Sequence, residues 1–349
     1  MSEMCFFLGA NTCRGFYSLY DEYIGASAPI RIWILKGGAG CGKSSFLRIV
    51  GGQAAAAGYT VHRILCSGDP ASLDGIHIQE LNVLLFDGTS PHVLEPPLVG
   101  HTGFYLDLSR FYLPGVPDLQ LMEEAYKEHY RRAYRWLSAA GDLGAVFVLS
   151  SETQERIRRK AVSLITRELR RQNRKAHILY RMFTDAFTCD GVLSLPETRR
   201  AIAPRIISVH GICGADACFL NAAAEAALAR GWDTILCPDP LNPEHIAHVL
   251  IPECGLGLSV GAGDRRIHLE RYVYAAEDKE EAKQIRETEA MRTALLTRAR
   301  SELLLAKQHH DRLEEAVNHS VDFNGVYAMA EDFAQKLLGG AAAPDAGQV

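Results

Sequence analysis

The chain of 349 residues is 48% hydrophobic and 23% charged, with a formal net charge of -5 and a pI near 6.2. This length leads us to expect two domains, and the mildly acidic balance argues against binding of nucleic acid over the whole surface. No apolar run approaches the roughly 18 residues of a membrane-spanning helix, and no secretory signal is evident. The nine cysteines form no C-x-x-C pair. We therefore expect a cytoplasmic protein without membrane contact.

The first distinctive element is an apolar segment, residues 30–35, followed by a glycine-rich turn and a helical stretch. The turn matches the P-loop pattern G-x-x-x-x-G-K-[ST] at every fixed position. Its glycines let backbone N–H groups approach phosphate oxygens, and the start of the following helix adds its positive dipole end. We expect Lys43 to reach the β- and γ-phosphates and Ser44 to ligate Mg²⁺. The predicted nucleotide-binding residues are Gly37, Gly38, Ala39, Gly40, Cys41, Gly42, Lys43, Ser44 and Ser45.

A second apolar strand, residues 82–86, ends at Asp87. P-loop proteins hold the metal with a further carboxylate, commonly at the end of a neighbouring strand. We therefore predict that Asp87 is the second metal ligand, beside Ser44, and takes part in catalysis together with Lys43. The alternative is that Asp87 only opens the turn formed with Gly88 and Thr89.

Residues 67–75 are expected to form a loop between two strands, at the carboxyl ends where ligands bind in open α/β sheets. Its acidic residues, Asp69 and Asp74, and the later Glu80 are candidates for activating water or supporting the site. Asp-Pro and Asp-Gly are also ordinary turn formers, so a purely local role stays open for each of them. We retain Asp74 and Glu80 as predicted catalytic residues.

Helical stretches follow this core, over residues 119–139, 152–175 and, later, 275 to about 318. Residues 156–175 are strongly basic, with one glutamate, Glu168, and an apolar stripe that includes Val162 and Leu164. Such a stretch suits nucleic acid or an acidic membrane, yet it contains no interleaved aromatics. An internal contact or a solvated face is therefore the favoured interpretation. The helical extensions also offer a surface for a protein partner or a homo-oligomer.

The chain repeats its own markers in the same order. Residues 12–15 reappear at 188–191, residues 46–47 at 219–220 and residues 64–66 at 235–237. The alternation of strand and helix in each copy predicts a parallel sheet flanked by helices. The fold class is thus α/β, with a P-loop NTPase-type sheet duplicated in tandem and carrying helical extensions. The expected domains are an active half over 1–177, a degenerate half over 178–338 and a disordered tail over 339–349.

The second copy lacks the residues of the phosphate site. In its glycine-rich turn, Asp216 and Ala217 stand where the first copy has its Gly-Lys pair, and Cys218 replaces the hydroxyl. Two unit charges 4 Å apart interact by about 4 kcal/mol at an effective dielectric of 20, so the loss of a lysine and the gain of an aspartate exceed what a helix dipole could restore. We predict one functional nucleotide site in the chain.

The segments LKGGAGCGKSSFL, CSGDPASLDG and LLFDGTSPH, with the paired TC-x-G openings, resemble a family of bacterial ATPase-like proteins with two tandem P-loop halves. The resemblance covers nearly the whole chain and implies a two-lobed protein with residues 37–44 as its nucleotide loop. This chain departs from the more symmetric members in its second loop. No N-K-x-D or L-S-G-G-Q segment is present, which disfavours a common GTPase and an ABC-transporter ATPase.

Three functions fit this pattern. The first is Mg²⁺-dependent ATP hydrolysis coupled to a conformational change. The second is phosphate transfer to a small molecule or nucleotide, for which Arg110, Arg131 and Arg132 are available but form no clear lid pattern. The third is a nucleotide-sensing scaffold that binds ATP without turnover.

Overall fold

The computed structural model describes residues 4–89, 93–96, 98–115, 119–273 and 279–339. These residues form an α/β protein of two compact units, each assembled from separate stretches of the chain. The first unit takes Met1–Gly9, Ser27–Arg132 and Ser301–Val349, and the second takes Ala10–Ala26 and Ala133–Arg300. Within the described residues, no helix combines the length and the apolar character needed to cross a bilayer.

The first unit is built on a six-stranded sheet of order β1-β5-β6-β7-β4-β8. Its strands are β1 (Met4–Phe6), β4 (Arg31–Lys36), β5 (Val61–Leu65), β6 (Leu73–Ile78), β7 (Val83–Asp87) and β8 (Gly103–Asp107). β6 is antiparallel to both of its neighbours, while the other pairs are parallel. The expectation of a wholly parallel sheet was therefore wrong. A parallel crossover needs a dozen or more residues, and only residues 79–82 connect β6 to β7.

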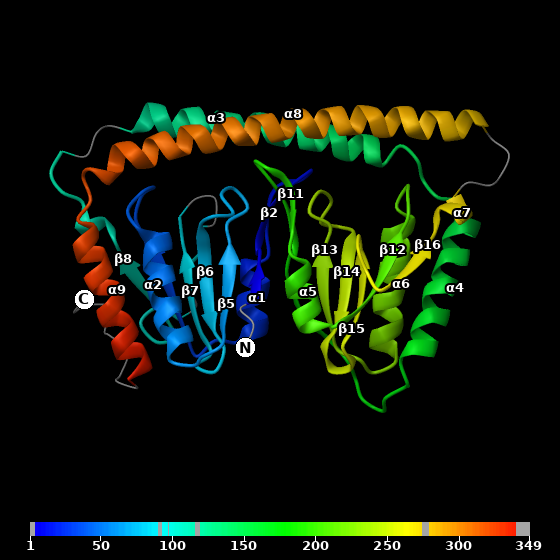
Figure 1. Cartoon of the computed structure of the whole chain (residues 1–349), viewed down its shortest axis with the longest axis horizontal. Coiled ribbons are helices and arrows are strands. Elements are labelled where there is room, and N and C mark those ends of the chain that lie inside the picture. Colours follow the sequence, from blue (N-terminus) through cyan, green and yellow to red (C-terminus); the bar gives the residue numbers. More distant parts are fainter. Residues whose placement is uncertain (1–3, 90–92, 97, 116–118, 274–278, 340–349) are drawn as a thin grey trace. The chain divides into compact units, whose positions relative to one another are not determined.

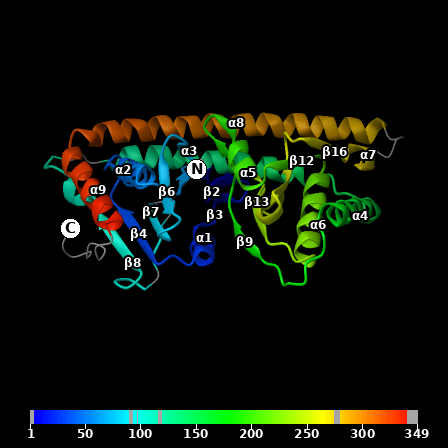
Figure 2. The same cartoon turned by 60° about the horizontal axis from the view of Figure 1, so that its bottom comes forward.

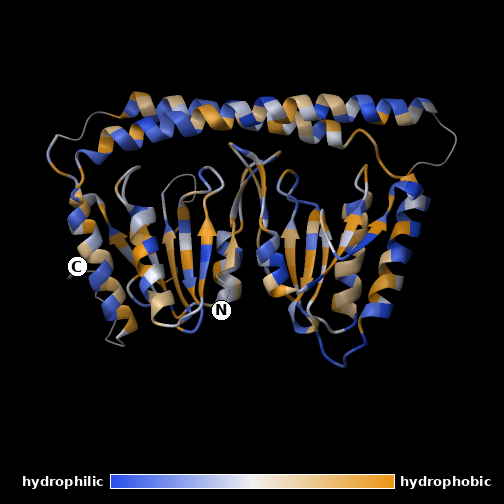
Figure 3. Cartoon of the chain, in the orientation of Figure 1, coloured by the Kyte–Doolittle hydropathy of each residue, from blue (hydrophilic) through white to orange (hydrophobic). Residues whose placement is uncertain are grey.

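The second unit repeats this sheet with the same strand order and the same directions, which supports a tandem duplicated α/β domain. Its antiparallel member, β14, occupies the place that β6 has in the first unit. The strands are β9 (Ile178–Arg181), β12 (Arg205–His210), β13 (Thr234–Pro238), β14 (Ile246–Ile251), β15 (Leu256–Val260) and β16 (Arg265–His268). Strands β7, β14 and β15 are mostly hydrophobic along their length, whereas β16 at the sheet edge is largely polar (Figure 3).

Helices and two small hairpins complete the described structure (Figure 1). The hairpins pair β2 (Gly9–Thr12) with β3 (Gly15–Ser18) and β10 (Asp185–Thr188) with β11 (Gly191–Ser194). The longer helices are α1 (Tyr20–Ser27), α2 (Lys43–Ala56), α3 (Gln120–Gly144), α4 (Ser151–Glu168), α5 (Pro196–Ile202), α6 (Ala215–Ala229), α8 (Lys279–Asn318) and α9 (Phe323–Leu338). Short elements are η1 (Ser109–Phe111), η2 (Pro252–Cys254) and α7 (Glu270–Val273).

The last helix of each repeat packs on the glycine-loop helix of the other. α4 follows the first repeat in sequence but packs on α6 in the second unit, and α9 ends the chain but packs on α2 in the first unit. α9 lies beside α2 in both views (Figure 1 and Figure 2). The halves expected over 1–177 and 178–338 follow the repeat along the chain, whereas the compact units exchange these helices. Residues 340–349 of the expected tail lie outside the described residues.

The basic helix α4 ends at Glu168, earlier than the expected residue 175, and uses its apolar side within the second unit. Leu164 is buried, whereas Val162 of the expected apolar stripe is exposed. Several arginines in this region are paired with carboxylates: Arg158 with Glu225 at 2.9 Å, Arg159 with Glu155 at 2.7 Å and Arg174 with Asp233 at 3.4 Å. These pairs offset part of the positive charge that the sequence concentrates here.

Truncating Phe333 tests the packing of α9. The Phe333 side chain is fully buried, and its ring centroid lies 5.3 Å from that of Trp33 and 5.7 Å from that of Phe46. We expect Phe333→Ala to lower the free energy of unfolding of the first unit by about 3–5 kcal/mol, measured by urea denaturation. Leu121→Ala, at an exposed position of α3, is the control and should change it by less than about 0.5 kcal/mol. A loss below about 1 kcal/mol for Phe333→Ala would contradict the packing of α9 on α2.

Candidate functional site

The glycine-rich turn joins β4 to α2 through residues 37–42, and its backbone requires glycine at several positions. Gly37, Gly40 and Gly42 have φ angles of 144°, 72° and 91°, in a region that side chains disfavour. A Cβ atom on Gly37 would also lie 2.5 Å from Sγ of Cys41, which is buried beneath the turn. Burial raises the pKa of the Cys41 thiol, which therefore stays neutral. The turn thus has no room for a side chain at Gly37, and glycine leaves its backbone N–H groups accessible to a bound group.

Lys43, the first residue of α2, folds back into this turn. Its side chain is only 8% exposed, and Nζ donates to the carbonyl oxygens of Gly37 at 3.0 Å and Gly38 at 2.7 Å. Nζ also lies 3.7 Å from Oδ2 of Asp87. Burial is the largest single influence and lowers the pKa of Lys43, but the Asp87 carboxylate and weaker contributions from other groups, including Glu314, together outweigh it, so the pKa is raised overall. The turn therefore holds a positive charge.

Asp87 ends β7, which is the parallel neighbour of β4, so its carboxylate comes to the same edge of the sheet as the turn. Its Oδ1 accepts hydrogen bonds from the backbone N–H of Thr89 at 2.9 Å and from the Thr89 hydroxyl at 2.6 Å. Asp87 thus opens the turn of residues 87–89 and also faces Lys43. The structure is therefore compatible with a role in that turn and with a role at the glycine-rich turn. Ser44 lies nearby, and its Oγ accepts from the N–H of Leu73 at 3.0 Å.

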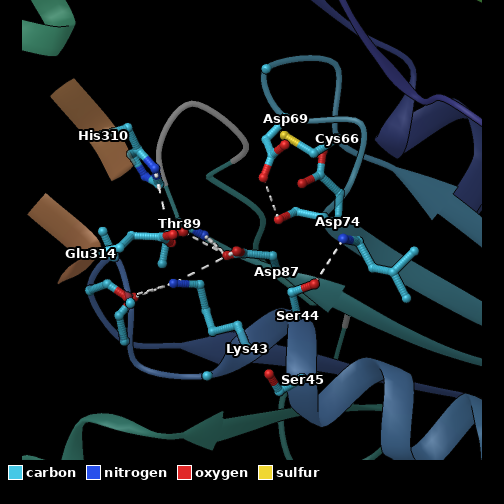
Figure 4. Close-up of a pocket in the computed structure, with 18 of the residues that line it drawn as sticks. Lys43, Ser44, Ser45, Cys66, Asp69, Asp74, Asp87, Thr89, His310 and Glu314 are labelled. Atoms are coloured by element: carbon cyan, nitrogen blue, oxygen red, sulfur yellow. Dashed lines mark hydrogen bonds and ion pairs between the residues drawn. The ribbon is translucent and has the colours of Figure 1, made fainter. Parts of the chain in front are cut away.

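The turn, Asp87 and Ser44 open on a cavity of about 770 Å³ (Figure 4). Asp74, the second residue of β6, is 4% exposed and lines it, as does Asp69 in the preceding loop. Of the predicted nucleotide-binding residues, the lining includes each one except Cys41. The structure therefore brings together the glycine-rich turn and three of the acidic side chains singled out from sequence.

Glu80, predicted to be catalytic, is not among the described residues that line this cavity. It follows β6, whose antiparallel direction returns the chain to the amino ends of β4 and β7, away from the turn. Its carboxylate accepts from the Thr60 N–H at 2.8 Å and from the Thr60 hydroxyl at 2.6 Å. The loop expected over residues 67–75 ends earlier than predicted, because β6 already begins at Leu73.

The remaining walls come from segments that sequence reasoning did not connect with the site. α8 passes directly over the turn: a Cβ atom on Gly40 would lie 3.2 Å from Cα of Glu314. The backbone N–H of Leu113 donates to Ser320 at 2.9 Å, which ties the end of α8 to the segment after η1. No local motif signals these contacts. Three helices, α3, α8 and α9, contribute lining residues: Glu123, Tyr126, Lys127, Tyr130, Lys307, His310, Glu314, Asn318, Phe323 and Tyr327.

Carboxylates outnumber cationic side chains among the described lining residues. Lys127 is paired with Glu123 at 2.8 Å, and Lys307 lies 2.8 Å from Asp311 and 3.5 Å from Asp69. The two other lining cations are Arg48, which donates to the Ala71 carbonyl, and Lys43, which lies inside the glycine-rich turn. The cavity therefore does not neutralise a highly charged anion by itself, and a bound cation would improve the balance.

The turn of the second unit, residues 211–214, is shorter than the first by two residues. Gly214 precedes α6 with a φ of 78°, as Gly42 precedes α2, so Ala215 rather than Ala217 stands in the place of Lys43. Asp216 lies in the first turn of α6, its Oδ1 accepts from the Ala217 N–H at 2.9 Å, and burial raises its pKa. By sheet register, Val260 takes the place of Asp87. The second unit thus lacks both charged groups of the first site.

Comparisons of the chain with protein-family models, with characterised proteins and with solved structures found no match. The resemblance to tandem P-loop ATPase-like proteins therefore rests on the sequence motifs. The assignment of a function rests on the cavity of the first unit and on the chemistry of the side chains that line it.

Proposed function

We propose that this protein binds a nucleoside triphosphate, ATP in the simplest case, with its phosphates in the turn of residues 37–42, and hydrolyses it. The observation that carries the proposal is the position of Lys43. A buried, charged lysine enclosed by a glycine-rich turn at the start of a helix is the arrangement that P-loops use for β- and γ-phosphates. The first sheet is then of the P-loop NTPase type, with β6 as an antiparallel insertion.

The residues of the cavity also suit Mg²⁺. Hydroxyl and carboxylate oxygens are the ligands that this hard cation prefers, and Ser44, Asp74 and Asp87 present these groups to one cavity. Ser44 and Asp87 would hold the ion, and Asp74 would support them. When bound, Mg²⁺ neutralises charge on the β- and γ-phosphates. The excess of carboxylates over cations in the lining agrees with this requirement.

Hydrolysis needs a group that orients water toward the γ-phosphorus, where a P–O bond forms as the bond to the β–γ bridging oxygen breaks, giving ADP and phosphate. Two lining carboxylates are candidates for this role: Asp74 on β6 and Glu314 on α8. Glu314 lies against the glycine-rich turn and adds to the positive pKa shift of Lys43. Asp74 was anticipated from the sequence, and Glu314 was not.

Phosphate transfer to another substrate and binding without turnover are the alternatives. The arginines considered for a kinase lid do not line the cavity. Arg131 is paired with Glu124 at 2.9 Å, and Arg132 with Glu128 at 3.1 Å, all on the exposed side of α3. This arrangement favours hydrolysis over transfer.

Calorimetric titration with ATP and Mg²⁺ tests the proposal. We expect one nucleotide per chain, because Ala215 and Val260 replace the charged pair in the second unit. Release of inorganic phosphate, measured in parallel, should require Mg²⁺ and no acceptor.

Each departure from this result has a distinct meaning. A stoichiometry of two would contradict the loss of the second site. Release of ADP only when an acceptor is supplied would identify a phosphotransferase, and tight binding without phosphate release would identify a sensor. No binding of ATP or GTP, with or without Mg²⁺, would refute the proposed function.

A further inference from the structure

Two aromatic side chains on α9 line the cavity: Phe323, which also packs against a small apolar cluster that includes Val326, and Tyr327, which belongs to no described core cluster. Phe323 and Tyr327 are one helical turn apart, with ring centroids 6.0 Å from each other and an interplanar angle of 34°. Both line the cavity, and Tyr327 is 39% exposed. The apolar face by which α9 packs on the first unit is made by other residues, Val326, Met329, Ala330, Phe333, Ala334 and Leu337. Core packing therefore does not account for the position of Tyr327.

These rings adjoin the place where the glycine-rich turn becomes a helix. A Cβ atom on Gly42 would lie 3.1 Å from Cγ1 of Val326 and 3.5 Å from the ring of Phe323. Lys43 and Asp87 mark the end of the site that suits the β- and γ-phosphates. Gly42 and Ser45 line the cavity next to Lys43, as do Phe323 and Tyr327, so the α-phosphate and nucleoside of a triphosphate held there would have room on the side of the first turn of α9.

A second pair of rings, Tyr126 and Tyr130 on α3, lies elsewhere in the cavity. Their centroids are 6.4 Å apart at 85°, and Tyr126 makes an edge contact with His310 at 5.4 Å. The Tyr130 hydroxyl covers Gly68, in the loop that follows β5. Tyr130 therefore adjoins the loop of Asp69, and the perpendicular rings of this pair offer no common face for a planar group.

We propose that Phe323 and Tyr327 form the surface on which the nucleobase of the bound nucleotide stacks. This inference rests on the proposed function and adds to it a base subsite supplied by the final helix of the chain. A base stacked on an aromatic ring contributes about 1–3 kcal/mol to binding. The nucleotide site of the first unit would thus be completed by α9, which follows the second repeat along the chain.

The test compares a ligand that has a base with one that does not. Dissociation constants for Mg²⁺-ATP and for inorganic tripolyphosphate with Mg²⁺ are measured by calorimetry on the wild type, Tyr327→Ala and Tyr327→Phe. We expect Tyr327→Ala to weaken ATP binding by roughly 5- to 150-fold, which is the stacking contribution converted to affinity, and to change tripolyphosphate binding less than about twofold. Tyr327→Phe keeps the ring and should bind ATP within about twofold of the wild type.

Tyr130→Ala is the matched control, because it removes a ring from the other aromatic pair. An ATP-selective loss in Tyr130→Ala and not in Tyr327→Ala would overturn the assignment, as would a Tyr327→Ala variant that binds ATP normally. Equal weakening of both ligands in Tyr327→Ala would also overturn it, because the defect would then concern the phosphates. A wild-type protein that binds neither ligand would refute the proposed function itself.

Discussion

Lys43→Ala is expected to weaken the binding of Mg²⁺-ATP by at least about 100-fold. The ammonium group is buried in the glycine-rich turn, where its hydrogen bonds to phosphate oxygens would replace those it now makes with Gly37 and Gly38. Hydrogen bonds to charged groups contribute about 1.5–3 kcal/mol each, so the loss of two corresponds to a 100-fold change or more. The variant also leaves the Asp87 carboxylate without its cation, which adds repulsion toward phosphate. Calorimetric titration measures the effect.

Lys175→Ala is the control for this substitution, because it removes an exposed lysine from the second unit. It should bind ATP as the wild type does. Thermal unfolding of both variants shows whether the fold is retained. If Lys43→Ala kept full affinity for ATP while remaining folded, the turn at residues 37–42 would not be the phosphate site.

Asp87→Asn is expected to lower the kcat of ATP hydrolysis by about 10²- to 10³-fold while changing ATP affinity much less. Removing one preorganised electrostatic group from a site where charge develops typically has an effect of this size on kcat. Asparagine keeps an oxygen that can accept from Thr89, so the turn is retained, but it removes the negative charge that faces Lys43 and suits Mg²⁺. Steady-state phosphate release at several Mg²⁺ concentrations measures the loss.

Thr89→Val separates the two roles of Asp87. This substitution removes the hydroxyl that donates to Asp87 at 2.6 Å but leaves the carboxylate charge in place. Hydrolysis should then stay within about threefold of the wild type. If Thr89→Val were as damaging as Asp87→Asn, the importance of Asp87 would lie in the turn and not in the metal site.

Much of the candidate site could be predicted because its parts are local in sequence. The glycine-rich turn, Lys43 and Ser44 are contiguous, and Asp87 follows an apolar strand directly, so neighbouring residues indicate their positions. The structure brings these side chains to one cavity. The duplication was also readable, because markers such as residues 12–15 and 188–191 are retained in order, and the two sheets share one topology. What the site binds remains a prediction for the titrations described above.

The parts that were missed or misplaced depend on pairing between distant segments. The antiparallel direction of β6 follows from its short connection to β7 and places Glu80 away from the turn. Leu35 pairs with Asp87 in the first sheet, and Val209 pairs with Val260 at the equivalent place in the second sheet. This equivalence shows that the glycine-rich turn after Val209 is the shorter one. A one-dimensional comparison of motifs does not contain this information, because register is set by backbone pairing and by burial.

By itself, the sequence determined the glycine-rich turn, its lysine, the aspartate at the end of a later strand and the repeat. Each of these features depends on backbone conformation and side-chain chemistry within a few neighbouring residues. Only the tertiary structure decided which helix covers which sheet, and so which side chains share the cavity. Tyr327 lines the cavity because α9 packs on α2, far away in sequence, and Glu314 lines it because α8 passes over the glycine-rich turn. Burial of apolar surface acts between any segments that can meet, so their separation along the chain does not reveal it.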